Sequence, residues 1–214
     1  MKKTFIREQQ LDGVGNWVWP EGDVGLWQGP SEEWPIFKEM FSRHLRGRRV
    51  CIQAGGAAGV YPRLLANMFE HVYTFEPDKL NFHCLVNNCR EVDNVTFYNT
   101  AIGDRAGDVS FIKSHPLNVG MHRVAYQHVE DAPRVHQVRI DDFEFQGVDF
   151  IMLDIEHYEY FALRGGMVTI LKHKPLIQME NAGYLEIIDL MKQLEYVQIE
   201  THNDDSIWKY RYYM

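Results

Sequence analysis

The chain has 214 residues, 45% of them hydrophobic and 24% charged, and its formal net charge is −8 at pH 7. This composition is typical of a globular protein with one domain or two small ones, and it excludes a mostly disordered chain. The acidic balance makes a nucleic acid partner unlikely, because a protein binds nucleic acid through a basic face.

No run of the sequence approaches the about 18 apolar residues that span a bilayer, so we predict no membrane partner. No apolar stretch follows the N-terminus, which argues against a secretory signal. The three cysteines are too few for a disulfide framework and indicate a reducing compartment. The predicted location is therefore the cytoplasm.

Residues 1–30 differ from the rest, because glycines alternate there with Trp17, Trp19 and Trp27. We interpret this segment as an irregular N-terminal arm, and residues 31–214 as a single α/β domain. Aromatic residues between glycines favour docking of the arm on the chain's own domain. A contact between copies in a homo-oligomer and a lid over an active site are the alternatives.

From Ser31, a predicted helix N-cap, the chain alternates between the helical and the strand pattern. Helices are expected over residues 31–45, 61–69, 78–89, 158–171 and 184–194. Strands are expected over residues 50–53, 72–75, 95–98, 109–112, 135–140, 150–153 and 176–179, with an antiparallel pair over 197–200 and 207–212. This order predicts a Rossmann-like, doubly wound and mostly parallel seven-stranded sheet with an antiparallel strand at one edge.

A glycine-rich turn follows the first strand of this alternation, where residues 53–59 read Q-A-G-G-A-A-G. Gly55, Gly56 and Gly59 allow a tight turn and a close approach of a ligand to the backbone, although a tight turn alone would explain them. No Lys-Ser or Lys-Thr follows, so this is not a phosphate loop. Ala57 stands where the dinucleotide fingerprint requires glycine, which lowers the prospect of NAD.

An acid, Glu76, follows the second strand and precedes Pro77. A carboxylate at this place accepts hydrogen bonds from both hydroxyls of a ribose. An acid that merely leads into the next helix is the alternative. Together, the glycine turn and Glu76 predict a cofactor that contains a nucleoside and lies across the strand ends.

These motifs, with four more in order, make the chain similar to the FkbM-type S-adenosylmethionine-dependent methyltransferases over about residues 49–181. The residues that carry the resemblance are residues 53–59, Phe75-Glu76-Pro77, residues 99–104, Ile140-Asp141-Asp142, Asp154-Ile155-Glu156 with Glu159, and Glu180. Two positions depart from the family pattern: Gln53 stands in place of an acid, and His157 stands where glycine is usual.

The resemblance implies S-adenosylmethionine as cofactor. Its methionine part would lie over Gly55, Gly56 and Gly59, its amino-acid end near Gln53 and its ribose on Glu76. Its adenine would be flanked by residues of the turn after the third strand, which are Thr100, Ala101 and Ile102. The implied reaction is O-methylation of a small molecule or glycan. A methyltransferase-like binding or assembly module without activity is the alternative, because Gln53 lacks the charge of the usual acid.

A hydroxyl acceptor requires a base, for which Asp154, Glu156 and His157 are the candidates. The alternative for the two acids is capping of the helix that follows them. Glu159 is interpreted as a structural partner of Arg164. We predict no metal centre. A divalent cation held by oxygen ligands is the alternative, with Asp154, Glu156, Glu180 and Asn181 as its ligands. The histidines at 115, 122, 128 and 136 lack zinc-site spacing and are expected in a loop that covers the substrate.

Overall fold

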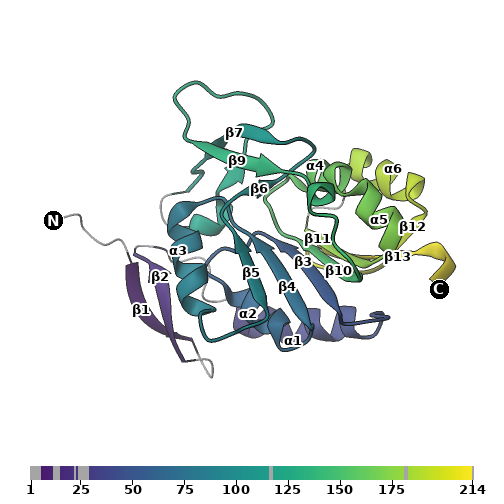
Figure 1. Ribbon diagram of the computed structural model, residues 1–214, viewed down its shortest axis with the longest axis horizontal. Coiled ribbons are helices and arrows are strands. Elements are labelled where there is room, and N and C mark those ends of the chain that lie inside the picture. Colours follow the sequence, from purple (N-terminus) through teal and green to yellow (C-terminus); the bar gives the residue numbers. More distant parts are fainter. Residues whose placement is uncertain are drawn as a thin grey trace.

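The computed structural model describes residues 6–11, 15–21, 23, 29–115, 118–180 and 183–213. Its centre is a seven-stranded sheet with the order β12-β13-β11-β10-β3-β4-β5 (Figure 1). The strands β5, β4, β3, β10 and β11 pair in parallel, which confirms the doubly wound α/β prediction. The strand bounds are β3 Val50–Ala54, β4 His71–Phe75, β5 Val95–Tyr98, β10 Val148–Leu153, β11 Leu176–Glu180, β12 Tyr196–His202 and β13 Asp205–Tyr210.

The antiparallel pair predicted at one edge of the sheet is confirmed, and the antiparallel strand β13 lies one place in from that edge. Strand β13 pairs antiparallel with β11 on one side and with β12 on the other, so β12 is the outermost strand. The chain crosses over from β11 to β12 and then turns back through Asn203, whose φ is +52°, to fill the place between them.

Helices cover both faces of the sheet. Successive side chains of its apolar parallel strands point to opposite faces, so both faces have to be buried. Phe150 packs with side chains of α1 (Gly29–Ser42) and α2 (Val60–Ala66), whereas Ile151 packs with those of α4 (Glu159–Gly165), α5 (Met167–His173) and α6 (Leu185–Gln193). Helix α3 (Lys79–Asn88) lies beside α2 (Figure 1). Helix α1 begins at Gly29, two residues before the expected cap.

The single helix predicted over residues 158–171 is two helices, α4 and α5, which meet at Gly166. Asp141, in the 3₁₀ turn η2 (Ile140–Phe143), accepts hydrogen bonds from the backbone amides of Val168 and Thr169 at 3.1 and 2.8 Å. These amides lie in the first turn of α5, so the break is stabilised by a cap from a residue distant in sequence.

A second, smaller sheet lies above the main sheet in Figure 1 and has the order β6-β9-β7-β8. Its strands are β6 Ala101–Ile102, β7 Gly107–Ile112, β8 Arg123–Val124 and β9 Arg134–Val138. The 3₁₀ turn η1 (Val119–Met121) immediately precedes β8. The strands predicted over residues 109–112 and 135–140 are therefore part of this separate sheet.

The N-terminal arm is regular where the structure describes it, which corrects the prediction of an irregular segment. Strands β1 (Ile6–Leu11) and β2 (Gly15–Pro20) form an antiparallel hairpin beside α3 (Figure 1). Trp17 and Trp19 are buried in a cluster with Ala58 and Cys84 of the chain's own domain. Trp27 lies outside the described residues.

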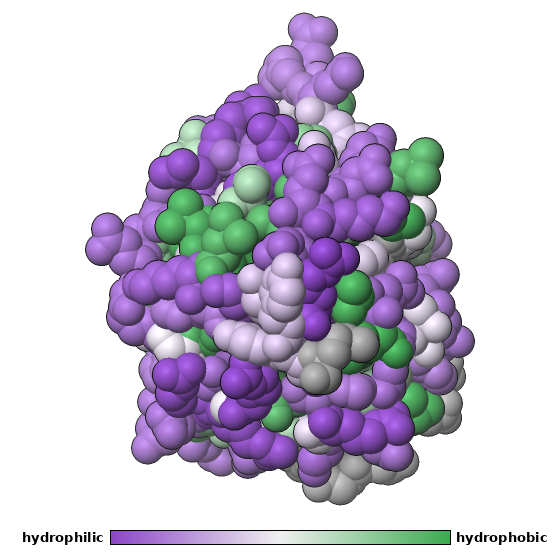
Figure 2. Space-filling view, turned by 90° about the vertical axis from the view of Figure 1, so that its right-hand side faces the viewer, coloured by the Kyte–Doolittle hydropathy of each residue, from purple (hydrophilic) through white to green (hydrophobic). Residues whose placement is uncertain are grey.

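The face at the right of Figure 1 has a mostly hydrophilic surface with separate hydrophobic patches (Figure 2). Among the exposed apolar side chains are Val168 and Leu171 of α5 and Leu185 of α6. The last described residues form a 3₁₀ turn, η3 (Arg211–Tyr213). Within the described residues, no helix is both long and apolar enough to cross a membrane.

Candidate active site

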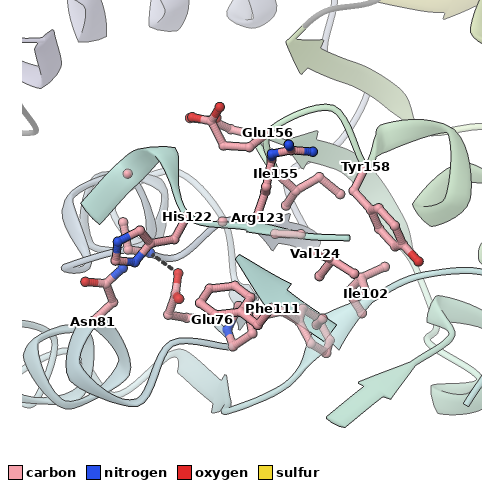
Figure 3. Close-up of a pocket in the computed structure, with 18 of the residues that line it drawn as sticks. Glu76, Asn81, Ile102, Phe111, His122, Arg123, Val124, Ile155, Glu156 and Tyr158 are labelled. Atoms are coloured by element: carbon pink, nitrogen blue, oxygen red, sulfur yellow. Dashed lines mark hydrogen bonds between the residues drawn. The ribbon is translucent and has the colours of Figure 1, made fainter. Parts of the chain in front are cut away.

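A cavity of about 390 Å³ lies at the carboxyl ends of β3, β4 and β10 (Figure 3). Ligands of doubly wound folds bind at this edge of the sheet. The cavity is lined by seven of the eleven predicted site residues, which are Gly55, Glu76, Thr100, Ala101, Ile102, Asp154 and Glu156. The other four, Gln53, Gly56, Gly59 and His157, do not line it.

Glu76 follows β4 and presents a buried carboxylate to the cavity. Its two oxygens accept hydrogen bonds from the backbone amides of Ala57 and Asp78, at 2.8 and 2.7 Å. Burial raises the pKa of Glu76 to about 7, with a further contribution from the nearby Asp78 charge, while the two amides favour the ionised form. The amides fix the carboxylate in place, and its remaining lone pairs can accept hydrogen bonds from a ligand.

Gln53 is fully buried in the sheet and does not line the cavity. Its Nε2 donates to the carbonyl oxygens of Ala54 and Gly55 at 3.2 and 2.9 Å, and its Oε1 accepts a hydrogen bond from the hydroxyl of Thr74 at 2.5 Å. A carboxylate has no hydrogen to donate to these carbonyls. The amide at position 53 therefore stabilises the start of the glycine turn from inside the protein.

Gly56 and Gly59 of the turn make room for neighbouring protein atoms. A Cβ atom on Gly56 would lie 2.9 Å from Leu85 of α3, and one on Gly59 would lie 3.1 Å from both Leu85 and Cys89. Only Gly55 of the three lines the cavity. Thr100 also has a structural contact, because its hydroxyl donates to the carbonyl oxygen of His136 at 2.7 Å.

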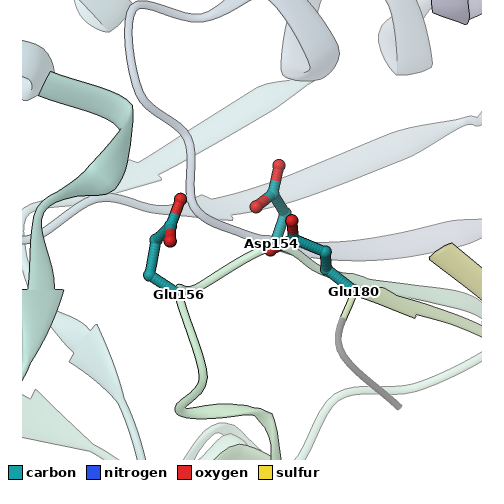
Figure 4. A group of neighbouring side chains, drawn as sticks. All are labelled: Asp154, Glu156 and Glu180. Atoms are coloured by element: carbon teal, nitrogen blue, oxygen red, sulfur yellow. The ribbon is translucent and has the colours of Figure 1, made fainter. Parts of the chain in front are cut away.

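Three carboxylates converge at one side of the cavity. Asp154 and Glu156 follow β10, Glu180 ends β11, and oxygens of all three lie within 4.8 Å of one another (Figure 4). Burial, and next the charge of Glu180, raises the pKa of Asp154 well above its usual range. Burial also raises the pKa of Glu156. A raised pKa makes a carboxylate a stronger base once it is ionised.

His157 lies beside this group with its side chain outside the cavity. Its Nδ1 lies 3.1 Å from the hydroxyl oxygen of Tyr184, and its φ of +73° is in the left-handed region that favours glycine. Glu156 before it has a φ of +55°. The chain therefore has a histidine in a backbone conformation that favours glycine.

Glu159 does not pair with Arg164, which corrects that prediction. Its Oε1 accepts a hydrogen bond from the Ile155 amide at 3.1 Å, whereas Arg164 lies 3.7 Å from Asp104. Glu159 is fully buried, and this burial raises its pKa to about 8. Its role in the structure is to hold the loop that carries Asp154 and Glu156.

Some lining residues had no signal in the sequence. Residues 118–124 cover part of the cavity and place His122, Arg123 and Val124 on its wall (Figure 3). The expectation that a histidine-containing loop covers the site holds for His122, while His115, His128 and His136 lie outside the lining. Asn81 of α3 also lines the cavity, and only the position of α3 against the glycine turn brings it there.

The strand order and the cavity at the carboxyl ends of the strands define a class I S-adenosylmethionine-dependent methyltransferase fold. The model of the methyltransferase FkbM domain matches residues 58–203. The chain therefore belongs to the FkbM methyltransferase family and is an S-adenosylmethionine-dependent methyltransferase domain. A search of curated proteins found no match.

Solved structures show the same fold. The FkbM methyltransferase from Methylobacillus flagellatus KT is 20% identical, with a TM-score of 0.56, over 76% of this chain and 44% of that chain. M. jannaschii TYW2 in complex with AdoMet is 11% identical, with a TM-score of 0.51, over 98% of this chain and 89% of that chain. The Pyrococcus abyssi tRNA (uracil-54, C5)-methyltransferase is 13% identical, with a TM-score of 0.54, over 96% of this chain and 44% of that chain. This chain thus spans less than half of the Methylobacillus protein.

The residues around the cavity fit a nucleoside cofactor. The volume is within the range of about 300–1,000 Å³ that is typical of small-molecule sites. Within the described residues, the buried atoms Asn81 Oδ1 and His122 Nδ1 have no hydrogen-bond partner, although both residues line the cavity. Unpaired buried polar atoms are costly, and hydroxyls of a ribose held by Glu76 would satisfy such atoms.

Proposed function

We propose that this domain methylates a hydroxyl group of a small molecule or glycan. The observation that carries the proposal is the position of Asp154 and Glu180, which line both the cofactor-sized cavity and a second hollow of about 660 Å³. Phe37 and Tyr61 provide the second hollow with aromatic surface. The carboxylates of Asp154 and Glu180 would lie between an acceptor in this hollow and a cofactor in the first cavity.

In this proposal the protein positions two molecules and removes one proton. Glu76 and the backbone at Gly55 bind the cofactor, and S-adenosylmethionine supplies an activated methyl group when bound. Asp154, with Glu156 beside it, accepts the proton of the acceptor hydroxyl at a carboxylate oxygen. Burial raises the pKa of both acids, which makes each a stronger base in its ionised form. His157, outside the cavity, is left without a place in the reaction.

The first test is calorimetric titration with S-adenosylhomocysteine, followed by a screen of hydroxyl acceptors with labelled S-adenosylmethionine. We expect micromolar binding that Glu76→Ala weakens by at least about tenfold, because hydrogen bonds to a charged group are strong. Asp154→Asn should keep the binding and lose methyl transfer by about 10²–10⁴-fold. Glu70→Ala, an exposed acid remote from the cavity lining, is the control.

Absence of binding at millimolar ligand would overturn the proposal and favour a binding or assembly module without activity. A second candidate role exists for the three carboxylates, because their spacing also suits a hard divalent cation. The titration is therefore repeated with magnesium. A gain in acceptor methylation that depends on magnesium, and that Glu156→Gln abolishes, would assign the carboxylates to metal binding instead of proton transfer.

A further inference from the structure

One buried acid connects the N-terminal arm to the cover of the cavity. Asp23 follows the hairpin and is 1% exposed. Its Oδ2 accepts a hydrogen bond from Trp19 Nε1 at 2.8 Å, and its Oδ1 accepts one from the Val119 amide at 3.0 Å. Trp19 belongs to β2, whereas Val119 begins η1. The two oxygens of one carboxylate thus join segments about a hundred residues apart.

Val119 belongs to a segment that we call the strap, residues 118–124. Residues of the strap line one part of the cavity, where the His122 ring lies beside Asn81 and near Glu76 (Figure 3). Asn118 stabilises the strap internally, because its side-chain oxygen accepts a hydrogen bond from the Gly120 amide at 3.1 Å. The position of the strap therefore sets the width of the cavity.

The strap has a second attachment on the opposite side, at Asp78. Asp78 caps α3 and pairs with Lys113 at 2.8 Å, and His122 Nδ1 lies 3.7 Å from the same oxygen. Burial opposes its ionisation, but His122 and Lys113 hold the pKa of Asp78 well below its usual range. Asp78 is thus a fixed negative charge near neutral pH. Asp23 accepts a hydrogen bond from the start of the strap, and the Asp78 carboxylate lies against His122 further along it.

The arm also contacts the glycine turn, through Asn88 of α3. The Asn88 side chain accepts a hydrogen bond from the Val18 amide at 2.7 Å and donates to the Val18 carbonyl at 2.8 Å. The same Nδ2 donates to the carbonyl oxygen of Ala58 at 2.7 Å. Trp17 and Trp19 pack on Ala58. The arm therefore contacts both the strap and the turn, which are two walls of one cavity.

We propose that the N-terminal arm is a clamp for the cofactor site and that Asp23 is the positioning residue that holds the strap over the bound cofactor. The inference rests on the proposed binding of the cofactor in this cavity. The arm lies outside residues 58–203, which the family model matches. Without Asp23, the Val119 amide and the Trp19 indole would each lose a buried partner, and the strap would be released at one end.

The test compares the full-length protein with Asp23→Ala, Asp23→Asn, Glu21→Ala and Asn94→Ala. Glu21 is an exposed acid two residues before Asp23. Asn94 donates to the carbonyls of Ala66 and Phe69 at 2.9 Å, away from the cavity lining, so its removal also costs two hydrogen bonds. The measurements are S-adenosylhomocysteine affinity and dissociation rate, hydrogen–deuterium exchange of residues 118–124, and thermal unfolding.

We expect Asp23→Ala to dissociate the ligand about tenfold faster and to lose amide protection in the strap. Asp23→Asn should be intermediate, because its one oxygen can still accept from Val119. Asn94→Ala should unfold at a lower temperature and bind normally, and Glu21→Ala should match the wild type. Wild-type protein that binds no ligand would refute the proposed function. Normal binding by Asp23→Ala, or equal losses in Asp23→Ala and Asn94→Ala, would refute the clamp alone. If Asp23→Ala does not fold, Asp23→Asn decides in the same way.

Discussion

The backbone of Gly55 lies directly against the backbone of Asp154. A Cβ atom added to Gly55 would overlap the carbonyl oxygen of Asp154, and the φ of Gly55 is +88°. Hydrogen bonds support this approach, because the Asp154 amide donates to the Ala54 carbonyl at 3.1 Å. The glycine turn and the acids that follow β10 are thus connected through the main chain of adjacent strands.

Replacement of Gly55 by alanine should therefore destabilise the fold as well as the site. We expect Gly55→Ala to lower the free energy of unfolding by ~3 kcal/mol, from overlap with Asp154 and the positive φ together. Gly107→Ala is the matched control, because Gly107 has a φ of +137° and no atom near its Cβ position. Its cost should be ~1 kcal/mol. Equal costs in urea denaturation would contradict the close approach.

At position 157 we expect glycine to give a more stable protein than alanine, which is the reverse of the order within a helix. We expect His157→Gly to be more stable than His157→Ala by ~1 kcal/mol, because only glycine adopts a φ of +73° without strain. Both variants lose the contact with Tyr184, so their difference isolates the backbone. At exposed Lys192 within α6, alanine should instead be more stable by ~1 kcal/mol. If alanine were more stable than glycine at position 157 as well as at position 192, the backbone at residue 157 would be unstrained.

Buried Glu159 predicts a loss of stability as the pH rises. Its pKa is raised to about 8 in the folded protein from the ordinary 4.5, so the folded state binds more protons between these values. Stability due to this group is then fully present below the unfolded pKa and is lost towards the folded pKa. Glu159→Gln keeps an acceptor for the Ile155 amide and removes the ionisation.

We expect the variant to gain on the order of 3 kcal/mol over the wild type between about pH 5 and about pH 9. The difference between the two denaturation profiles isolates Glu159 from Glu76, which both proteins retain. Parallel profiles would mean that Glu159 is ionised throughout or is solvated in solution.

Restoring the acid that the family usually has at position 53 should weaken this protein. Gln53→Glu places a carboxylate against the carbonyls of Ala54 and Gly55, and we expect a loss of ~2 kcal/mol near neutral pH. Gln146→Glu is the control, since Gln146 also donates to a carbonyl, that of Glu144, but at an exposed site. Its change should stay within ~0.5 kcal/mol. Improved cofactor binding in Gln53→Glu would show that this side chain reaches the ligand.

Periodicity and turn residues were sufficient to predict the central sheet. The strand predicted at residues 95–98 is β5, and strands predicted at residues 50–53, 72–75, 150–153 and 176–179 are β3, β4, β10 and β11. The glycine turn and Glu76 also predict the edge of the sheet at which the cavity lies, because strand direction determines which loops meet there.

Contacts between distant segments were beyond such reasoning. Asp141 caps α5 from another loop, and Asn88 bonds to the backbone of the N-terminal hairpin. The residues around Asp141 and Asn88 carry no sequence pattern that predicts either contact. The sequence also did not predict which residues of the glycine turn face the cavity. Gln53 and Gly55 are two residues apart, yet only Gly55 of the two lines the cavity. Side-chain burial in the sheet decided this difference.

The position of β13 has a consequence for biosynthesis. Because β13 pairs between β11 and β12, β11 has only β10 as a partner and β12 has none in this sheet until residues 205–210 have left the ribosome. Until then, β11 presents an open edge with unpaired backbone groups, and such edges invite pairing with other chains. Closure of the sheet is therefore a late, non-local event, and the nascent chain is most prone to aggregate just before it.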